Sequence, residues 1–322
     1  MSDLKIAIQC NELGQRGGIA TYSNRLNESL NKIKGVSSKQ FVERIRNNPD
    51  VICVQYEPGM LQPNQLQGLL QKYPQPIVVI AHHMGYLPQM YPMIDGIIIH
   101  SNSQLNGLEE PWSYKEIPHP ALVFPKKSKS NLRKKYGLPK DKKIIGTMGF
   151  IAGTGKQLPI MVRHMLDNLK DDEFLYFMTS FWKGGDFGFE EQIRKYVESH
   201  KRKDQFRMDN DFVTEEVLNE KMQCCDLLFA WSKFDSPGSN SGSAIDMVGS
   251  GVKTIVKDSP HYSFVGSLEG VEIGRPNQKD FAEDVLKCLR ESDLTKVPDP
   301  KPYSWDNLVK EYVEYFREIF GE

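Results

Sequence analysis

The chain has few cysteines, and they follow no known pairing or metal-binding pattern. None of them forms a CxxC or Cys/His spacing. The five are Cys10, Cys53, Cys224, Cys225 and Cys288. This pattern argues against a disulfide framework and a zinc site. Reduced thiols in a cytosol fit best, so we expect a cytoplasmic protein without a bound metal.

The sequence also lacks a large net charge and a long apolar run. Its 322 residues carry a formal charge of -1, so no global positive field favours tight, non-specific binding to nucleic acid or to an anionic membrane. The opening residues MSDLKIAIQC contain neither the apolar core of a signal peptide nor a stretch that would span a bilayer. We therefore expect no export by that route and no transmembrane segment.

Several catalytic and nucleotide-binding motifs are missing as well. No GxSxG occurs and no cysteine lies in an activating motif, so a hydrolase with a nucleophile triad is disfavoured. GxGxxG and the Walker spacing are also absent, which argues against a classical dinucleotide fingerprint or P-loop.

Short apolar runs alternate with longer helical patterns along the whole chain. The runs that predict buried parallel strands are residues 5–9, 51–56, 76–82, 95–101, 143–150, 174–180, 224–232 and 252–257. The alternation breaks at Pro118, Pro120 and Pro125 and then restarts, which predicts two doubly wound α/β domains. We place them at residues 1–125 and 126–303.

The last segment, 304–322, has apolar residues at helical spacing. They are Leu308, Tyr312, Val313, Phe316 and Phe320. This pattern predicts an amphipathic helix that buries one face against the rest of the protein.

Two segments rich in small residues follow predicted strands and open predicted helices. Gly17 and Gly18 lie near the first helix start, where glycine lets backbone N–H groups approach an anion, although such pairs also make ordinary turns. The hydroxyl-rich stretch 239–243 precedes a helix expected at about Ala244. It suits a diphosphate or, alternatively, is a plain Ser-rich N-cap.

Some charged and imidazole side chains stand at similar strand ends. Lys156, beside Gly153, would neutralise phosphate charge or is a solvated surface lysine. His82 and His83 end the strand at 76–82, where one of the two would contact a sugar and the other a structural partner. For His100 and His119 the structural reading is favoured, and Asp246 also suits a helix first turn.

Over nearly the whole chain these segments resemble, in order, the retaining GT-B glycosyltransferases of the glycosyltransferase family 4-like group. The resemblance is carried by GGIATYSNRL, VICVQYEPG, VVIAHH, DGIIIHSNSQ and IPHP in the first half. In the second half it is carried by LRKKYGLPKDKKIIGTMGFIAGTGKQ, DFVTEEVLNEKMQCCDLLFAWS, SGSAIDMVGSGVKTIVKDSPHY and YSWDNLVKEYVEYF.

The resemblance implies a GT-B fold, with two Rossmann-like domains facing across a cleft and a C-terminal helix that crosses back to the first. It implies a nucleotide-sugar donor on the second domain and an unknown acceptor on the first. As catalytic residues it implies His82 on the transferred sugar and Lys156 on the diphosphate. As donor-binding residues it implies Gly17, Gly18, Gly153, Ser241, Gly242, Ser243 and Asp246.

The chain also departs from the family pattern. Many members carry Gly-Arg where this chain has Gly149 and Phe150, so one phosphate-binding cation is missing. The family often has two glutamates separated by seven residues, whereas Asp235 and Asp246 have ten residues between them. We interpret the chain as a variant branch with a Ser/Gly donor loop.

We therefore expect a retaining transfer that needs neither a metal nor a cofactor, since no DxD-like pair lies beside the donor loop. Three alternatives remain. The basic stretches KKSKSNLRKK and KRKDQFR would serve a transferase that acts on a nucleic-acid base or another polymer. The missing arginine would suit a non-catalytic nucleotide-sugar-binding protein. An epimerase with the same fold is the third.

Overall fold

The computed structural model describes residues 3–11, 13, 17–45, 48–106, 108, 113–151, 158–181, 188–233 and 238–321. The chain divides into two compact units. Unit 1 consists of Met1–Pro120, Ser236–Asn240 and Pro302–Glu322, and unit 2 of Ala121–Asp235 and Ser241–Lys301. The short segment Ser236–Asn240 belongs to unit 1, although the segments before and after it belong to unit 2. Nothing in the sequence predicts this assignment.

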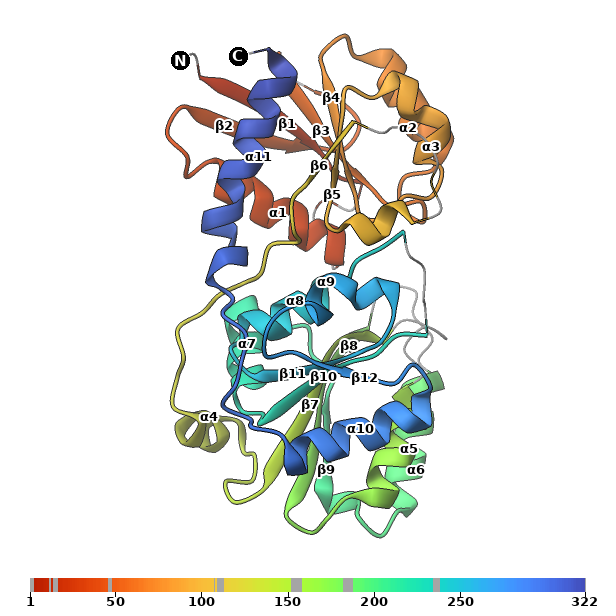
Figure 1. Ribbon diagram of the computed structural model, residues 1–322, viewed down its shortest axis with the longest axis vertical. Helices are drawn as coiled ribbons and strands as arrows, with labels where there is room; N and C mark the ends of the chain where they lie inside the picture. The colour runs from red at the N-terminus through yellow and green to blue at the C-terminus, as the bar shows by residue number, and fades with distance from the viewer. Residues whose placement is uncertain are drawn as a thin grey trace. The chain divides into compact units, whose positions relative to one another are not determined.

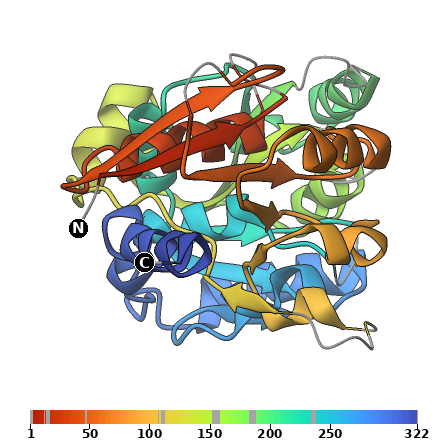
Figure 2. The same ribbon diagram turned by 90° about the horizontal axis from the view of Figure 1, so that it is seen from above.

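Unit 1 is built on a parallel six-stranded sheet with the strand order β2-β1-β3-β4-β5-β6, seen from above in Figure 2. Its strands are β1 (Leu4–Gln9), β2 (Val36–Phe41), β3 (Val51–Tyr56), β4 (Ile77–Ala81), β5 (Gly96–Ile99) and β6 (Tyr114–Glu116). Its helices are α1 (Gly18–Leu30), α2 (Pro63–Lys72), α3 (Leu87–Met90) and α11 (Trp305–Phe320). Strands β3 and β4 are buried along their whole length, as apolar runs covered on both faces must be.

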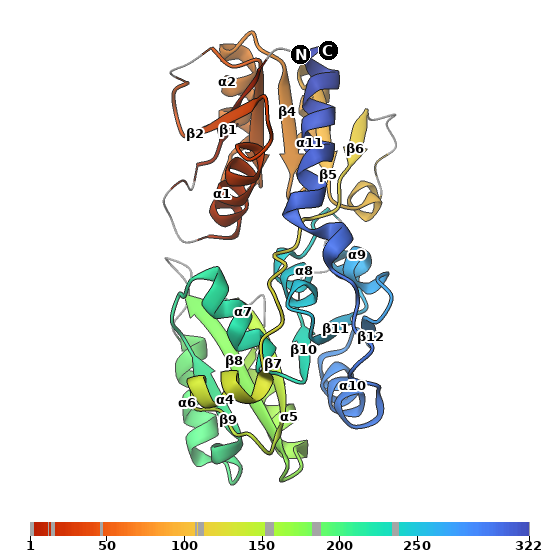
Figure 3. The same cartoon turned by 90° about the vertical axis from the view of Figure 1, so that its left-hand side faces the viewer.

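Unit 2 has a second parallel sheet, with the order β12-β11-β10-β7-β8-β9. Its strands are β7 (Lys143–Ile151), β8 (Glu173–Phe181), β9 (Phe206–Asp209), β10 (Leu227–Ala230), β11 (Lys253–Lys257) and β12 (Glu272–Gly274). Its helices are α4 (Lys129–Tyr136), α5 (Leu158–Asn168), α6 (Gly188–Ser199), α7 (Glu215–Gln223), α8 (Gly242–Gly249), α9 (Ser263–Gly266) and α10 (Gln278–Glu291). Helices α5, α6 and α10 cover one face of this sheet, and α4, α7 and α8 lie on the other (Figures 1 and 3).

Four strands have no counterpart in the apolar runs of the sequence. Strand β2 (VSSKQF) is apolar only at its two ends and lies at a sheet edge, and β6, β9 and β12 are only three or four residues long. Edge and short strands need no continuous apolar run, since they are not buried on both faces along their length. Helix α8 begins at Gly242, two residues before the expected start at Ala244.

Each sheet contains one point at which the strand order reverses. In unit 1 the chain continues from β1 to β2 on one side and then crosses to β3 on the other. In unit 2 it passes from β7 to β8 and β9 and then crosses to β10. In doubly wound sheets, ligands bind outside the carboxyl ends of the strands at this point. The β1/β3 and β7/β10 ends are therefore where a site is expected.

Helix α11 is part of the core of unit 1 although it is the last element of the chain. It packs against α1 and β3 (Figure 1). Its buried residues are Trp305, Leu308, Val309, Tyr312, Val313, Tyr315 and Phe316. A Cβ at Gly96 of β5 would lie 2.8 Å from the Tyr315 hydroxyl oxygen, so glycine is required for this close approach. The hydroxyl oxygens of Tyr22 in α1 and Tyr312 in α11 are 2.5 Å apart in a buried hydrogen bond.

We expect Tyr312→Phe to lower the free energy of unfolding, because the Tyr22 hydroxyl would stay buried without its partner. The cost should be about 1–3 kcal/mol, and removal of both hydroxyls should cost less than the sum of the two single changes. Urea unfolding of Tyr312→Phe, Tyr22→Phe and the double variant measures this coupling. Strictly additive losses would show that the two hydroxyls do not interact.

Candidate functional site

Aromatic and imidazole rings meet at the carboxyl edge of the unit 1 sheet. His82 follows β4, His100 follows β5, His119 follows β6, and Tyr22 projects from α1. The Tyr22 ring centre lies 4.7 Å from that of His82, 5.4 Å from His100 and 5.1 Å from His119. Trp305 of α11 lies 5.0 Å from Tyr22 on the same ring network. We call these five side chains the ring cluster.

Two of the three histidines in the ring cluster are buried and donate to backbone carbonyls. The Nδ1 atom of His100 is 2.9 Å from the Ile117 oxygen, and that of His119 is 3.0 Å from the Pro120 oxygen. A carbonyl only accepts, so each Nδ1 carries the hydrogen. Burial, reinforced by the neighbouring imidazole, lowers the pKa of both His100 and His119 to about 3. Both rings are therefore neutral at physiological pH.

His82 differs because it is partly exposed and its ring contacts a side chain. Its Nε2 atom is 2.9 Å from Oε1 of Gln55, a buried residue of β3. Burial of the ring and the nearby His100 hold the pKa of His82 well below its usual range. Sequence reasoning missed Gln55, whose place next to His82 follows only from the pairing of β3 with β4.

His83, the other histidine of the pair, has structural partners. Its Nδ1 accepts a hydrogen bond from the Gly85 N–H at 3.0 Å, and its backbone pairs with Ser239. Gly238 and Asn240, on either side of Ser239, make further hydrogen bonds to unit 1. The Gly238 oxygen accepts from the Met84 N–H at 2.9 Å, and the Asn240 side chain donates to Oε1 of Gln104 at 3.1 Å. Residues 238–240, which include the first two residues of the 239–243 stretch, are thus part of unit 1.

The glycine pair lies at the unit 1 switch point, as its place after β1 requires. Gly17 is the N-cap of α1 and makes no side-chain cap, and Gly18 is the first helical residue. A Cβ at Gly18 would meet no heavy atom within 4 Å, so packing does not require glycine there. The donor-binding role of both glycines stays a prediction.

The Ser/Gly loop lies at the unit 2 switch point and starts α8. The Ser241 hydroxyl accepts from the Ala244 N–H at 3.3 Å and lies 3.2 Å from the Ser243 hydroxyl. Ser241 is therefore an N-cap, while Gly242 and Ser243 are partly exposed in the first turn. Capping leaves the other first-turn N–H groups for an anion. A role for these residues in donor binding remains a prediction.

Asp246 lies farther along α8 and is buried. Its Oδ1 accepts from the Leu122 N–H at 3.2 Å, which ties the helix to the first residues of unit 2. This contact gives the carboxylate a structural partner, and its donor-binding role remains untested. Gly153 and Lys156 lie outside the described residues, as does Asp235.

Two side-chain pairs at the carboxyl edge of the unit 2 sheet were not predicted from the sequence. Lys257, the last residue of β11, is 3% exposed and lies with its ammonium 4.9 Å from the centre of the Trp231 ring. It donates to the Ser232 oxygen at 3.1 Å. Phe150 at the end of β7 stacks on Phe212, after β9, with ring centres 6.1 Å apart and an angle of 18°. Phe212 is 43% exposed, which makes this pair an aromatic surface.

The basic stretch at the start of unit 2 is held by carboxylates. Lys127, Lys135 and the Tyr136 hydroxyl all donate to Glu220, and these hydrogen bonds lower the pKa of Glu220 to about 2. A second carboxylate, Asp226, pairs with two further cations of the stretch, Lys129 and Arg133. Cations with such partners are less available to a phosphate backbone.

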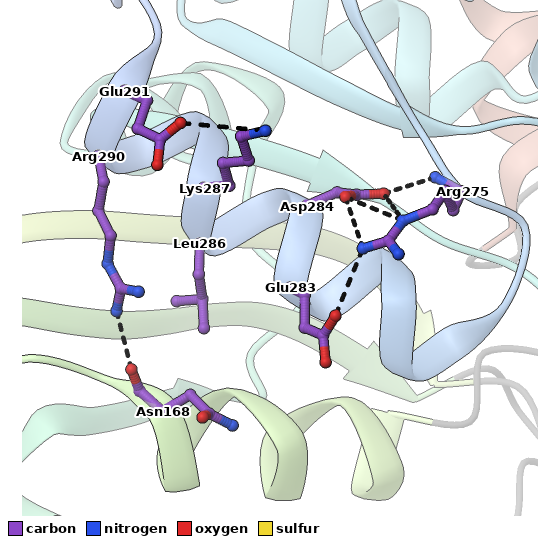
Figure 4. A pocket seen from close by; sticks show the side chains of 8 residues that line it. All are labelled: Asn168, Arg275, Glu283, Asp284, Leu286, Lys287, Arg290 and Glu291. Carbon is purple, nitrogen blue, oxygen red and sulfur yellow. Dashed lines mark hydrogen bonds and ion pairs between the residues drawn. The ribbon is translucent and has the colours of Figure 1, made fainter.

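One hollow of about 320 Å³ lies on α10, away from the switch points (Figure 4). Its rim is formed by charged side chains that pair with one another. Arg275 donates to both carboxylate oxygens of Asp284, and Lys287 pairs with Glu291. Arg290 pairs with the buried Glu173. The paired rim offers no side chain placed for chemistry, and we assign it no role.

Within the described ranges, no group of three or more His, Cys, Asp or Glu side chains is arranged to hold a metal ion. Over the same part of the chain, no helix has the length and apolarity that a bilayer crossing requires.

Several solved structures are similar to this chain over its whole length. A sucrose-phosphate synthase from Thermosynechococcus elongatus has 13% identity and a TM-score of 0.77, over 98% of this chain and 99% of that one. A glycosyltransferase from Rickettsia africae has 13% identity and a TM-score of 0.72, over 100% of both chains. Anabaena HepE, in complex with UDP and glucose, has 11% identity and a TM-score of 0.74, over 98% of this chain and 100% of that one.

No model of a protein family and no curated protein sequence matches the chain. At such low sequence identity, the structural similarity is evidence for the fold alone. The two parallel six-stranded sheets with their helices form the two-domain α/β fold of the GT-B class, as the sequence predicted.

The buried histidines of the ring cluster make stability depend on pH. Their pKa values of about 3 in the folded protein lie below about 6.5, the value of an unfolded histidine. Their contribution is thus complete above pH ~6.5 and is lost as the pH falls toward 3. Each should cost about 1.4 kcal/mol per pH unit in that window. Urea unfolding at pH 7, 6 and 5 measures the slope.

The variant His100→Asn/His119→Asn should have a shallower slope, because asparagine keeps a donor for the backbone carbonyl and does not titrate. His164→Asn in α5 is the matched control and should keep the wild-type slope. An equally steep loss in the double variant would contradict the assignment.

Proposed function

We propose that the chain is a glycosyltransferase that moves a sugar from a nucleoside-diphosphate sugar to an acceptor, with retention of the anomeric configuration. The observation that carries the proposal is the start of α8 at the β7/β10 switch point, where the buried Ser241 caps the helix and the partly exposed Gly242 and Ser243 form its first turn. An anion fits there because free N–H groups and the helix dipole both favour negative charge. The GT-B fold, which HepE uses with UDP and glucose, supports the same reading.

On this proposal the donor diphosphate binds at the start of α8 through Gly242 and Ser243. Negative charge grows on the diphosphate as the bond to the sugar breaks in an oxocarbenium-like transition state. Donors and cations already in place stabilise that charge, each by about 2.7–4 kcal/mol in comparable anion sites. Lys156 supplies one cation, as the family resemblance implies. Lys257, held at the end of β11, supplies a second positive charge at this edge.

The aromatic surface of Phe150 and Phe212 is the proposed contact for the nucleobase. It lies at the ends of β7 and β9, on the same edge of the sheet as the start of α8. Every nucleobase has a flat face that stacks on aromatic rings, so the pair would bind it with little choice of base. An aromatic ring thus stands where many relatives place the phosphate-binding arginine.

On unit 1, His82 would contact a hydroxyl of the transferred sugar, and Gly17 and Gly18 would admit the donor phosphates to the start of α1. The proposal also includes a cytoplasmic enzyme that needs no metal and no cofactor. Charge stabilisation by helix N-termini and lysines is sufficient for a leaving diphosphate without an ion.

A non-catalytic nucleotide-sugar-binding protein is the second candidate. It is favoured by Phe150 in place of an arginine, since loss of that cation removes a source of transition-state stabilisation. Such a protein would bind the donor through the same edge of unit 2 without consuming it.

We expect one class of nucleotide sugar to raise the melting temperature of the protein. A ligand of the native state stabilises it by mass action, by about 2.7 kcal/mol at a hundred times its Kd. Thermal-shift and calorimetric screens of UDP-, GDP-, dTDP- and ADP-sugars measure this. Slow release of nucleoside diphosphate from the selected donor would mark an enzyme, and binding without release would mark the second candidate. No response to any of the four would contradict both.

Phe212→Ala should weaken donor binding while leaving the melting temperature of the free protein nearly unchanged, because the side chain is 43% exposed. Loss of one base-stacking contact corresponds to about 1–3 kcal/mol, or a rise in Kd of about five- to 150-fold. Calorimetry with UDP and with UDP-glucose measures the change. Ile273→Ala, at a 58% exposed apolar residue of β12, is the matched control and should leave Kd unchanged. Equal effects of the two variants would rule out the aromatic contact.

A further inference from the structure

Gln55 determines which nitrogen of His82 carries the hydrogen. The Oε1 atom of Gln55 is 2.9 Å from Nε2 of His82, and an amide oxygen can only accept. The other end of the amide is occupied, because Nε2 of Gln55 donates to the sulfur of Cys53 at 3.5 Å. With the amide held in this direction, His82 must donate from Nε2.

The remaining nitrogen of His82 is then an acceptor. The groups that interact with this ring are Tyr22, whose ring lies at 85° to it, His100, 5.5 Å away between ring centres, and His119. Burial raises the pKa of Tyr22 and lowers the pKa of His100 and His119, so all three are neutral at physiological pH. Arg25 of α1 is a positive charge that acts on His119 in this group. A neutral imidazole protonated at Nε2 has a lone pair at Nδ1. In the described part of the chain, that Nδ1 has no hydrogen-bond partner, and His82 is partly exposed.

The position of the ring is also restrained from two sides. The backbone N–H of His82 donates to the Tyr56 oxygen at 3.0 Å, which continues the pairing of β4 with β3. The edge-to-face contact with Tyr22 fixes the plane of the ring. The side chain is therefore set in place before any ligand arrives.

We propose that Gln55 is a positioning residue that holds His82 in the Nε2–H tautomer, so that Nδ1 accepts a hydrogen bond from a hydroxyl of the bound sugar. This inference rests on the proposed function and makes it more specific. A lone pair attracts a hydroxyl hydrogen and repels the oxygens of a carboxylate or phosphate. The group that His82 recognises is therefore an uncharged hydroxyl of the sugar and not an anion.

The tautomer can be measured without any activity, by nitrogen NMR of protein labelled with ¹⁵N-histidine. The His82 signals are assigned by their loss in His82→Gln. The wild type should show hydrogen on Nε2 and none on Nδ1. Gln55→Leu should give a mixture of the two tautomers, because the acceptor is gone. Gln9→Leu removes a buried glutamine at the end of the neighbouring strand β1 and is the matched control.

Gln55→Glu is a second variant, with a side chain of nearly the same shape, and it tests the role of Gln55 even if Gln55→Leu does not fold. It should keep the Nε2–H tautomer, because the carboxylate also accepts. Its negative charge should raise the pKa of His82. Protonated His82 cannot accept at Nδ1, so kcat/KM should be lost at a higher pH than in the wild type as the pH falls. Gln55→Leu should lower kcat/KM by about tenfold, the equivalent of one hydrogen bond.

The hydroxyl contact is tested with UDP-glucose and UDP as probes. UDP-glucose should shift the Nδ1 signal of His82, and UDP alone should not. An Nδ1–H tautomer in the wild type, or an unchanged tautomer in Gln55→Leu, would overturn the inference. So would an unmoved Nδ1 signal when calorimetry shows that UDP-glucose is bound. If neither probe binds, the hydroxyl contact falls together with the proposed function, while the NMR of the free protein still decides the role of Gln55.

Discussion

All strands of both sheets run parallel to their neighbours, and the candidate sites depend on this constraint. A parallel sheet brings the carboxyl ends of its strands to one edge, and each following helix starts from that edge with its free N–H groups. Residues from distant parts of the chain therefore meet there. In unit 1 these are the ends of β3, β4 and β5 with the start of α1, and in unit 2 the ends of β7, β10 and β11 with the start of α8.

The two edges differ in their chemistry. The edge of unit 1 carries a group of neutral rings, because burial among neighbouring imidazoles disfavours a positive charge on any of them. A neutral imidazole has one N–H donor and one acceptor nitrogen, a combination that suits a hydroxyl group. The edge of unit 2 carries small residues, a helix start and the buried ammonium of Lys257, which favour an anion.

Several residues that belong to a predicted functional motif also make structural contacts. Ser241 caps α8, Asp246 holds the backbone of Leu122, and His83 supports the turn at Gly85. Gly242 and Ser243 are the more exposed members of their motif, and His82 is partly exposed. A strand end is crowded, so only some of its polar side chains can face a ligand, and the others satisfy the backbone groups that the turn leaves unpaired.

The order of the short apolar runs was sufficient to predict two parallel sheets and the α/β class, because strands that are covered on both faces need such runs. The closing helix was predicted from apolar residues at helical spacing. The short and edge strands carry no such signal. The sequence also marked the glycine pair and the Ser/Gly loop, since both follow strands directly. It did not reveal Gln55 beside His82, Phe150 on Phe212, or Lys257 on Trp231. Those pairs exist only because strand pairing joins segments far apart in the chain, and spacing along a sequence holds no record of which strands become neighbours.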